Sequence, residues 1–506
     1  MDNNGQLRRI IIATVISFAF FFAYDYFVLA PQTQMVEQNK TTSIKNREIT
    51  KNQEIKSKNT KMKISTVCVV ESENYEAKID SLGRISSFIL KQNKFNKDGK
   101  HLELVNPKFP KPLEVRFQDE KLNKLAFSTP VAVDKTKIDV TKPTSVTLTQ
   151  KLNNITLTKV ITFYPDGHYE VKINLSTPTV YYVSPGYRPN VSIDNLTIHG
   201  VVIKKSDGTL SIIEDSDAKP QTIPNAIFAA GFDRYYTTLL FSKKPFSVVV
   251  TPDKEENPVV YIQQSTNSEF TGYIGPKFVD TLASINKKLV DVVQYGVGTF
   301  FAKNLFFLLD WFYKMVGNWG VAIILLVILV RIVLFPLTYK GMVSMYKLKE
   351  LAPKMKEIQE RYKKDPQKLQ MHMMKLYKEH GANPLGGCLP LLLQIPIFYG
   401  IYKLLLYAIE LKGASFLWIR DLSGMDPYFI LPILMGITMY IHQKLTPTNF
   451  QDPMQEKVFK FLPLIFTAMM ATFPAGLVLY WTTNNVLSIA QQWLINKIME
   501  SKKAKK

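Results

Sequence analysis

Cysteine and histidine are scarce in this chain of 506 residues. Its 2 cysteines, Cys68 and Cys388, are too few for a disulfide framework, and its 6 histidines lack the spacing of metal ligands. A nucleophile elbow and a phosphate-binding loop are also missing, and Gly296-Val297-Gly298 lacks the third glycine of a dinucleotide motif. These absences argue against an enzyme, and neither a metal nor a cofactor is expected.

Acidic residues are outnumbered by basic ones, with 42 Asp and Glu against 63 Lys and Arg and a net charge of +21. Such an excess suits a partner that is nucleic acid, an anionic membrane surface or an acidic protein. Residues 40–300 are polar, whereas residues 315–495 contain apolar runs long enough to cross about 30 Å of hydrocarbon. The sequence therefore predicts an α-helical integral membrane protein with a large soluble domain. Nucleic-acid recognition is not expected as its primary role.

The N-terminal residues predict a membrane anchor followed by a tether. Residues 10–30 form an apolar run behind Arg8 and Arg9, interrupted only by Asp25. A cleaved signal peptide is the alternative, but the aromatic residues of the run favour a retained transmembrane anchor over residues 1–30. Residues 31–64 are rich in Asn, Gln, Lys and Thr with almost no aromatics, which indicates a flexible tether.

Residues 65–285 show the alternation of β-strands. In residues 155–163 and 169–175 apolar and polar side chains alternate, and Pro165-Asp166-Gly167 lies between the two runs, so we expect a hairpin with one buried face. Shorter strands are predicted at 67–70, at 77–90 around Gly83, at 247–251 and at 259–263. A span of this length suits one all-β domain, and a sandwich is the expected architecture.

Five further transmembrane helices are predicted at about 318–339, 385–409, 428–445, 458–472 and 475–495. The last two are separated at Pro474, because proline interrupts a helix. With the anchor they make six transmembrane helices. Residues 286–316 are apolar on one side and predict a helix in the membrane interface.

Basic residues orient these helices. Residues 339–384 hold 11 Lys and Arg against 5 acids and residues 497–506 form a basic tail, whereas the loop at 410–426 is not basic. Cytoplasmic loops are enriched in Lys and Arg. Both termini are therefore expected in the cytoplasm, with the β domain on the other side of the membrane.

Arg331 interrupts the helix predicted at 318–339. A guanidinium at this depth costs on the order of 2.5 to 3.5 kcal/mol, and no acid in the core membrane helices is available to pair with it. Polar residues follow one face of the last helix and reach the depth of Arg331. Snorkelling of Arg331 toward the cytoplasm and helix packing through the polar stripe are the alternatives. A water-containing groove open to the cytoplasm accounts for both features.

The candidate lining of this groove is Arg331, Gln394, Thr438, Gln443, Tyr480, Trp481, Asn484, Asn485, Ser488 and Gln491. Lys403 lies near the outer end of its helix. We expect its side chain to snorkel outward and assign it no role.

Residues 340–380 predict a cytoplasmic amphipathic helical hairpin that turns at Asp365-Pro366. Its methionines suit adaptable apolar binding. A docking surface for a ribosome, a targeting factor or a nascent chain is one interpretation, and its residues would be Met345, Lys349, Lys356, Met373 and Tyr377. A solvated basic hairpin that only follows the positive-inside rule is equally well supported.

Residues 295–495 contain several distinctive strings, which are NWG at 318–320, Arg331 followed by FPLT at 335–338, NPLGGCLP at 383–390, QIPIF at 394–398, WIRDLS at 418–423 and FPAGL at 473–477. In these strings the chain closely resembles the YidC family of membrane protein insertases, of the YidC/Oxa superfamily, in its long Gram-negative form. The resemblance implies an insertase and folding chaperone of the bacterial inner membrane. It also implies a periplasmic supersandwich domain and a five-helix core, whose hydrophilic groove is closed to the periplasm and contains the arginine that matches Arg331.

The resemblance further implies partners. The clients would be nascent membrane proteins, inserted either by this protein alone or beside the Sec translocon (SecYEG and SecDF). The ribosome, the signal recognition particle receptor and anionic lipids are further candidates. Two positions depart from the family pattern: Val327 replaces a usual threonine one turn before Arg331, and Lys403 replaces a usual aromatic residue.

Two other functions stay open at this point. A small-solute transporter would use the same groove, but no intramembrane acid near Arg331 is available for ion coupling, and residues 315–495 show no inverted repeat. A carbohydrate-binding or mutarotase-like enzyme is suggested by the family's supersandwich domain, but no acid/base pair stands out in residues 65–285.

Overall fold

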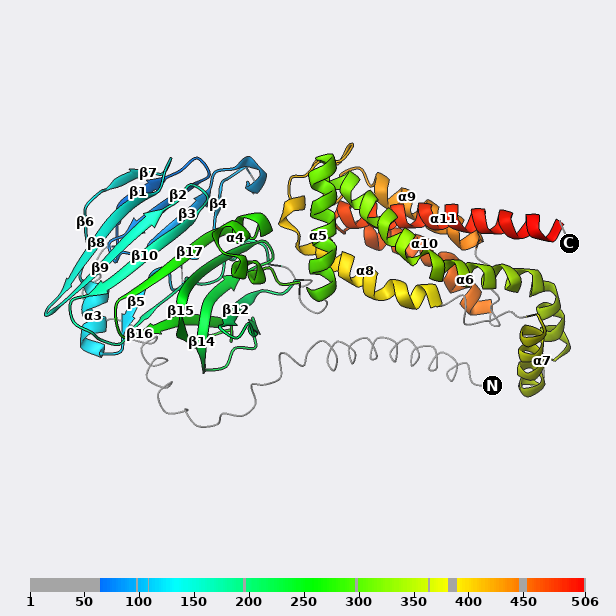
Figure 1. Ribbon diagram of the computed structural model, residues 1–506, viewed down its shortest axis with the longest axis horizontal. Coiled ribbons are helices and arrows are strands. Elements are labelled where there is room, and N and C mark those ends of the chain that lie inside the picture. The colour runs from blue at the N-terminus through cyan, green and yellow to red at the C-terminus, as the bar shows by residue number, and fades with distance from the viewer. Residues whose placement is uncertain are drawn as a thin grey trace. The chain divides into compact units, whose positions relative to one another are not determined.

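The computed structural model describes residues 64–96, 99–107, 109–193, 197–295, 299–362, 365–380, 389–445 and 453–504. The chain divides between Val297 and Gly298 into two compact units, the first built mainly of strands and the second of helices (Figure 1). The predicted anchor at 1–30 and nearly all of the predicted tether at 31–64 lie outside the described residues.

The first unit contains two β-sheets. The smaller has the strand order β4-β3-β2-β1-β7, and the main path of the larger is β13-β12-β14-β15-β17-β10-β9-β8-β6, with β16, β11 and β5 branching from β15. The strands are β1 Thr66–Glu71, β2 Tyr75–Asp80, β3 Ile85–Leu90, β4 Leu102–Glu103, β5 Val115–Phe117, β6 Ala132–Val133, β7 Lys137–Asp139, β8 Thr144–Leu152, β9 Ile155–Phe163, β10 His168–Leu175, β11 Tyr181–Val183, β12 Gly200–Lys205, β13 Leu210–Glu214, β14 Gln221–Phe232, β15 Tyr236–Pro252, β16 Pro258–Gln264 and β17 Ser268–Pro276.

The two sheets pack face to face, which confirms the predicted sandwich. Strands β9 and β10 form the predicted hairpin, with Phe163 paired to Tyr169 across the turn. The smaller sheet reaches this turn, because the hydroxyl of Tyr75 donates to the carbonyl of Tyr164 at 2.9 Å. Phe88 of the smaller sheet is fully buried. The alternating apolar residues of β9 and β10 thus face the smaller sheet and form the core of the unit.

Helices also occur in this unit, which corrects the all-β prediction. They are α3 Glu120–Ser128, α4 Val279–Ile285 and the short 3-10 helices η2 Asn93–Phe95 and η3 Lys287–Val292. Helix α3 begins at Asp119, whose carboxylate accepts from the backbone N–H of Leu122 at 2.7 Å. Such an N-cap stabilises a helix start, and it lies outside the period-two alternation on which the all-β prediction rests.

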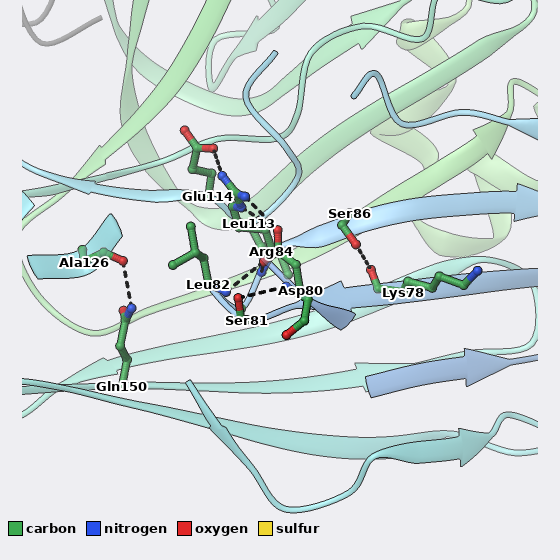
Figure 2. A network of polar contacts seen from close by, with 12 residues as sticks. Lys78, Asp80, Ser81, Leu82, Arg84, Ser86, Leu113, Glu114, Ala126 and Gln150 are labelled. Carbon is green, nitrogen blue, oxygen red and sulfur yellow. Dashed lines mark hydrogen bonds and ion pairs between the residues drawn. The ribbon is translucent and has the colours of Figure 1, made fainter. Parts of the chain in front are cut away.

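A network of buried charges lies at the start of β3 (Figure 2). The guanidinium of Arg84 pairs with Asp80 at 2.8 Å and with Glu114 at 2.9 Å. Glu114 also pairs with Arg116 at 2.8 Å. Buried charges are tolerated when they are paired and hydrogen-bonded in this way.

Lys159 of β9 connects the two sheets by hydrogen bonds, close to the buried charges of Arg84 and Glu114. Its side chain is only 2% exposed, and Nζ donates to the carbonyls of Gly83 at 2.8 Å and Leu113 at 2.7 Å. Gly83 belongs to the turn between β2 and β3, and Leu113 precedes β5; both have left-handed backbone conformations, with φ of 69° and 65°. Burial lowers the pKa of the Lys159 amine to about 7.

The second unit is a helical bundle. Its elements are α5 Thr299–Val316, α6 Trp319–Arg361, α7 Pro366–Glu379, α8 Leu389–Tyr407, η5 Ile409–Leu411, α9 Ile430–Leu445, α10 Pro453–Met470 and α11 Ala475–Ala504. Helix α5 packs against α6 and α8, α11 packs against α6 and α9, and α10 packs against α9.

Several helix boundaries differ from the prediction. Helix α6 passes unbroken through residue 339, with Pro336 and Pro353 inside it, so the membrane helix predicted at 318–339 and the first arm of the hairpin are one helix. Helix α11 likewise continues past residue 495 into the basic tail. A change from apolar to charged side chains does not end a helix, because Lys, Glu and Met have high helix propensity. The predicted interfacial helix begins at Thr299 instead of residue 286.

Within the described residues, Trp319–Pro336 is the one helical stretch long and apolar enough to cross a membrane, and Ile397–Tyr407 is a shorter apolar stretch. The four other predicted membrane helices of the core correspond to α8, α9, α10 and α11, and the predicted anchor lies outside the described residues. The number of six transmembrane helices therefore stays a prediction.

Candidate functional site

Arg331 lies inside the helical bundle with its guanidinium directed at α11. Its side chain is only 8% exposed. Nε donates to Asn484 Oδ1 at 3.0 Å and Nη1 to Gln491 Oε1 at 3.1 Å, while Nη2 donates to the backbone carbonyl of Asn484 at 3.1 Å and to Ser488 Oγ. Four of the five N–H donors of a guanidinium are thus used. Every acceptor is neutral, in agreement with the absence of acids from the predicted membrane segments at 318–339 and 475–495.

The sequence brings these groups together through helix periodicity. Asn484, Ser488 and Gln491 are spaced at i, i+4 and i+7, so they share one face of α11. Helices α6 and α11 run side by side in the same direction, since Ile323 lies beside Gly476 and Arg331 lies beside Asn484. Because Ser488 and Gln491 lie one and two turns beyond Asn484, the guanidinium extends both across to α11 and toward the C-terminal end of α6. It shares this direction with a snorkelling side chain, but it ends on polar groups of the neighbouring helix.

Three other residues of the predicted groove, Thr438, Gln443 and Asn485, form hydrogen bonds elsewhere. Asn485 is buried, and its Nδ2 approaches Thr438 Oγ1 at 3.4 Å and the carbonyl of Met435 at 3.5 Å, both on α9. Gln443 donates from Nε2 to the carbonyl of Phe459 on α10 at 2.5 Å. These polar groups join α9 to its neighbours α10 and α11. For Asn485 this is the alternative considered above, in which the polar face of the last helix serves helix packing.

Tyr480 and Trp481 lie one turn before the contacts of Arg331, among aromatic rings. The Trp481 ring lies 4.8 Å from Phe398 of α8 and 5.6 Å from Phe466 of α10, between ring centroids. Tyr480 is buried, and its ring lies 6.2 Å from that of Phe398. The character of α11 changes here, because the residues just before Trp481 are buried and apolar and the polar face follows it.

Comparisons with known proteins identify the family to which the chain belongs. The family models described as "60Kd inner membrane protein" and "YidC periplasmic domain" match residues 311–503 and 234–308. The chain is 52% identical to the membrane protein insertase YidC of Wolinella succinogenes, over 99% of this chain and 98% of that protein. The chain belongs to the YidC family of membrane protein insertases. The YidC of Campylobacter jejuni is 48% identical over 100% of this chain and 98% of that protein.

Solved structures of YidC insertases are also similar to this chain. The structure titled "Active YidC insertase crystal structure with the first transmembrane domain resolved" is 20% identical, with a TM-score of 0.39, and the match covers 85% of this chain and 94% of that one. The resemblance read from the sequence motifs is confirmed by the curated relatives. The YidC family is one of inner-membrane proteins with a periplasmic domain, and a non-enzymatic insertase fits the absence of catalytic motifs.

The two positions that depart from the YidC pattern lie in different surroundings. Val327 is buried on α6, one turn before Arg331. The ammonium of Lys403 lies 5.7, 5.8 and 5.6 Å from the ring centroids of Tyr399, Tyr402 and Tyr407. Aromatic faces stabilise a cation at such distances.

Two of the five predicted docking residues, Met373 and Tyr377, lie in or against the core of the hairpin at 340–380. Met373 packs with Leu351, Met355 and Leu376 in a core between α6 and α7, and Tyr377 lies against this core. The prediction that Met373 and Tyr377 face a partner therefore needs correction. An apolar stripe on each of two adjacent helices is buried most simply by pairing the stripes with each other.

The exposed surface of the hairpin has other members. Lys349 and Lys356 are exposed on α6, and Met371 and Met374 are exposed on α7. The sequence alone does not distinguish these two exposed methionines from the buried Met373 of the same helix. The side chains of Met345 and Gln394 lie outside the described part of the structure, so their predicted roles stay predictions.

Proposed function

We propose that this insertase receives the polar, acidic segments of newly made membrane proteins at Arg331 and releases the adjoining apolar segments into lipid. The observation that carries the proposal is a buried guanidinium bonded only to neutral groups of α11 in a member of an insertase family. We call Arg331, Asn484, Ser488 and Gln491 the arginine cluster. The candidates Thr438, Gln443 and Asn485 support its surroundings by joining α9 to α10 and α11.

Electrostatics favours a carboxylate at this cluster. A hydrogen bond between ionised groups is roughly twice as strong as one between neutral groups, and a carboxylate binds a guanidinium through two bonds at once. The attraction is also larger in a medium of low dielectric constant than in water. An acidic client segment that exchanges with the amide and hydroxyl ligands therefore lowers its cost of entering the membrane, and no covalent step is needed.

The proposed orientation places both termini and the hairpin in the cytoplasm and the β domain in the periplasm. The basic hairpin and tail support it through the positive-inside rule. Helix α5 has an amphipathic surface, because Phe307, Trp311 and Met315 are exposed along one face while Ala302 and Leu309 are buried on the other. Such a helix suits the membrane interface.

The proposed partners follow from the clients. Nascent membrane proteins would arrive from the ribosome, either directly or with the Sec translocon (SecYEG and SecDF) and the signal recognition particle receptor. The exposed lysines and methionines of the hairpin suit a cytoplasmic docking partner, and its basic charge suits anionic lipid headgroups.

The test is an insertion assay with the full chain in proteoliposomes. Two single-span clients are compared whose translocated segments differ only in Asp and Glu against Asn and Gln. We expect Arg331→Ala to lower insertion of the acidic client about tenfold, equivalent to about 1.4 kcal/mol. Arg331→Lys should retain more activity, because a point charge supplies much of the attraction.

The matched control is Arg361→Ala, which removes an exposed arginine from the same helix. Arg361 pairs with Glu357 at 2.9 Å on the surface of the hairpin, and surface pairs contribute little. Equal insertion of the acidic client by the wild type and by Arg331→Ala would contradict the proposal.

A further inference from the structure

Gln491 has the longest side chain among the ligands of Arg331 and lies farthest along α11. The carbonyl of Asn484 is fixed by the helix, and the Ser488 hydroxyl donates to that same carbonyl at 2.8 Å. Gln491 reaches Nη1 only through its long side chain, and it is only partly buried. Nη1 also carries the fifth N–H, which has no acceptor among the described residues.

We propose that Gln491 determines the charge specificity of the insertase, because its neutral amide keeps Arg331 available to client segments that contain Asp or Glu. This inference rests on the proposed function and names the client chemistry more closely. A carboxylate approaching from the partly exposed side would meet Nη1 first, displace the Gln491 amide and use the fifth N–H as well.

The neutral charge of Gln491 explains why the site would prefer acidic client segments over neutral ones. An amide oxygen stabilises the guanidinium enough for burial at rest. A carboxylate binds it more strongly, because it adds a full opposite charge and accepts two N–H groups at once. A neutral client segment offers no better acceptor than Gln491, so it gains little at this site. A basic segment is repelled by the same cation.

A carboxylate built into position 491 would remove this preference. The change Gln491→Glu introduces a negative charge and keeps the size of the side chain. The new carboxylate would already be attached to α11, so its effective concentration at Arg331 would exceed that of any client segment. Arg331 would then be neutralised internally, and acidic clients would lose their advantage.

The experiment measures the ratio of acidic to neutral client insertion by the full chain in proteoliposomes, with the two clients described above. Gln491→Glu is expected to lower this ratio about tenfold, and Gln491→Met, which removes the competing acceptor, is expected to raise it. Gln492→Glu is the matched control. It places the same charge on the neighbouring residue, whose Nε2 donates to Asn496 at 2.8 Å on another face of α11, and it should keep the wild-type ratio.

An unchanged ratio in Gln491→Glu would overturn the proposal, and so would an equal fall in Gln492→Glu, which would point to a general effect of charge in α11. If the Gln491→Glu protein does not fold, Gln491→Met decides, and an unchanged ratio there would overturn the proposal. Failure of the proposed function is recognised separately, since Arg331→Ala would then leave the acidic client unaffected.

Discussion

The buried amine of Lys159 predicts a stability that rises with pH. Burial lowers the pKa of this amine from an ordinary 10.5 to about 7 in the folded protein. Between these two values the unfolded chain binds more protons than the folded one, so unfolding becomes less favourable as the pH rises. For these two pKa values the free energy of unfolding should increase by about 2 kcal/mol from pH 7 to pH 9.

The free energy of unfolding is expected to rise only up to about pH 9, because the ionisation of other buried groups then lowers it. Burial raises the pKa of the Cys68 thiol from 9.0 to about 11, and it raises the pKa of Tyr75 well above its usual 10.0. These groups stay protonated in the folded state after their unfolded counterparts have lost protons. Their stabilising contribution is therefore lost as the pH rises beyond 9.

The assay uses Cys68 as a probe, because its side chain is fully buried in β1. With Cys388→Ser it is the only thiol of the full chain, and pulses of a maleimide reveal the urea midpoint at which the β domain exposes it. The midpoint should rise between pH 7 and pH 9 and should rise much less in Lys159→Met. Equal rises in the two proteins would refute the assignment of this effect to Lys159.

Two further changes test the helical unit. A Cβ on Gly436 would lie 2.0 Å from Thr467 Oγ1, so Gly436→Ala should cost about 1 to 3 kcal/mol by overpacking α9 on α10. Thermal unfolding in detergent should show this loss for Gly436→Ala and little change for Gly424→Ala, whose Cβ would meet only ordinary contacts. Met373→Ala should cost about 2 to 5 kcal/mol locally and speed hydrogen exchange in α7, whereas exposed Met374→Ala should not; equal protection would contradict the hairpin core.

Local patterns of apolar and polar residues were sufficient to predict many of the strands and helices. The alternation in β9 and β10 gave the hairpin, and the apolar runs gave the helices near Arg331. The spacing of Asn484, Ser488 and Gln491 placed them on one face, and the absence of acids predicted that no carboxylate of these segments pairs with the guanidinium. That these three residues themselves bind the guanidinium was not predicted. The predicted features depend on periodicity and composition, which a single sequence records directly.

Features that depend on contacts between distant segments were not predictable in this way. The polar residues of α11 divide into those that meet Arg331 and those, such as Asn485, that meet α9. Which neighbour each one faces is decided by how the helices pack. Met373 was assigned to a docking surface for the same reason, since an apolar stripe does not reveal whether a partner or another arm of the same chain covers it.

The position of a client relative to Arg331 is the most direct test of the proposed mechanism. A photo-crosslinking residue at Gln491 is combined with ribosome-stalled nascent chains, and one at exposed Lys151 of β8 serves as the outside control. We expect membrane-protein chains with an acidic segment to label Gln491, and soluble chains to label neither position. Full insertion of the client without labelling at Gln491 would show that the segment crosses elsewhere and would contradict the role of the arginine cluster.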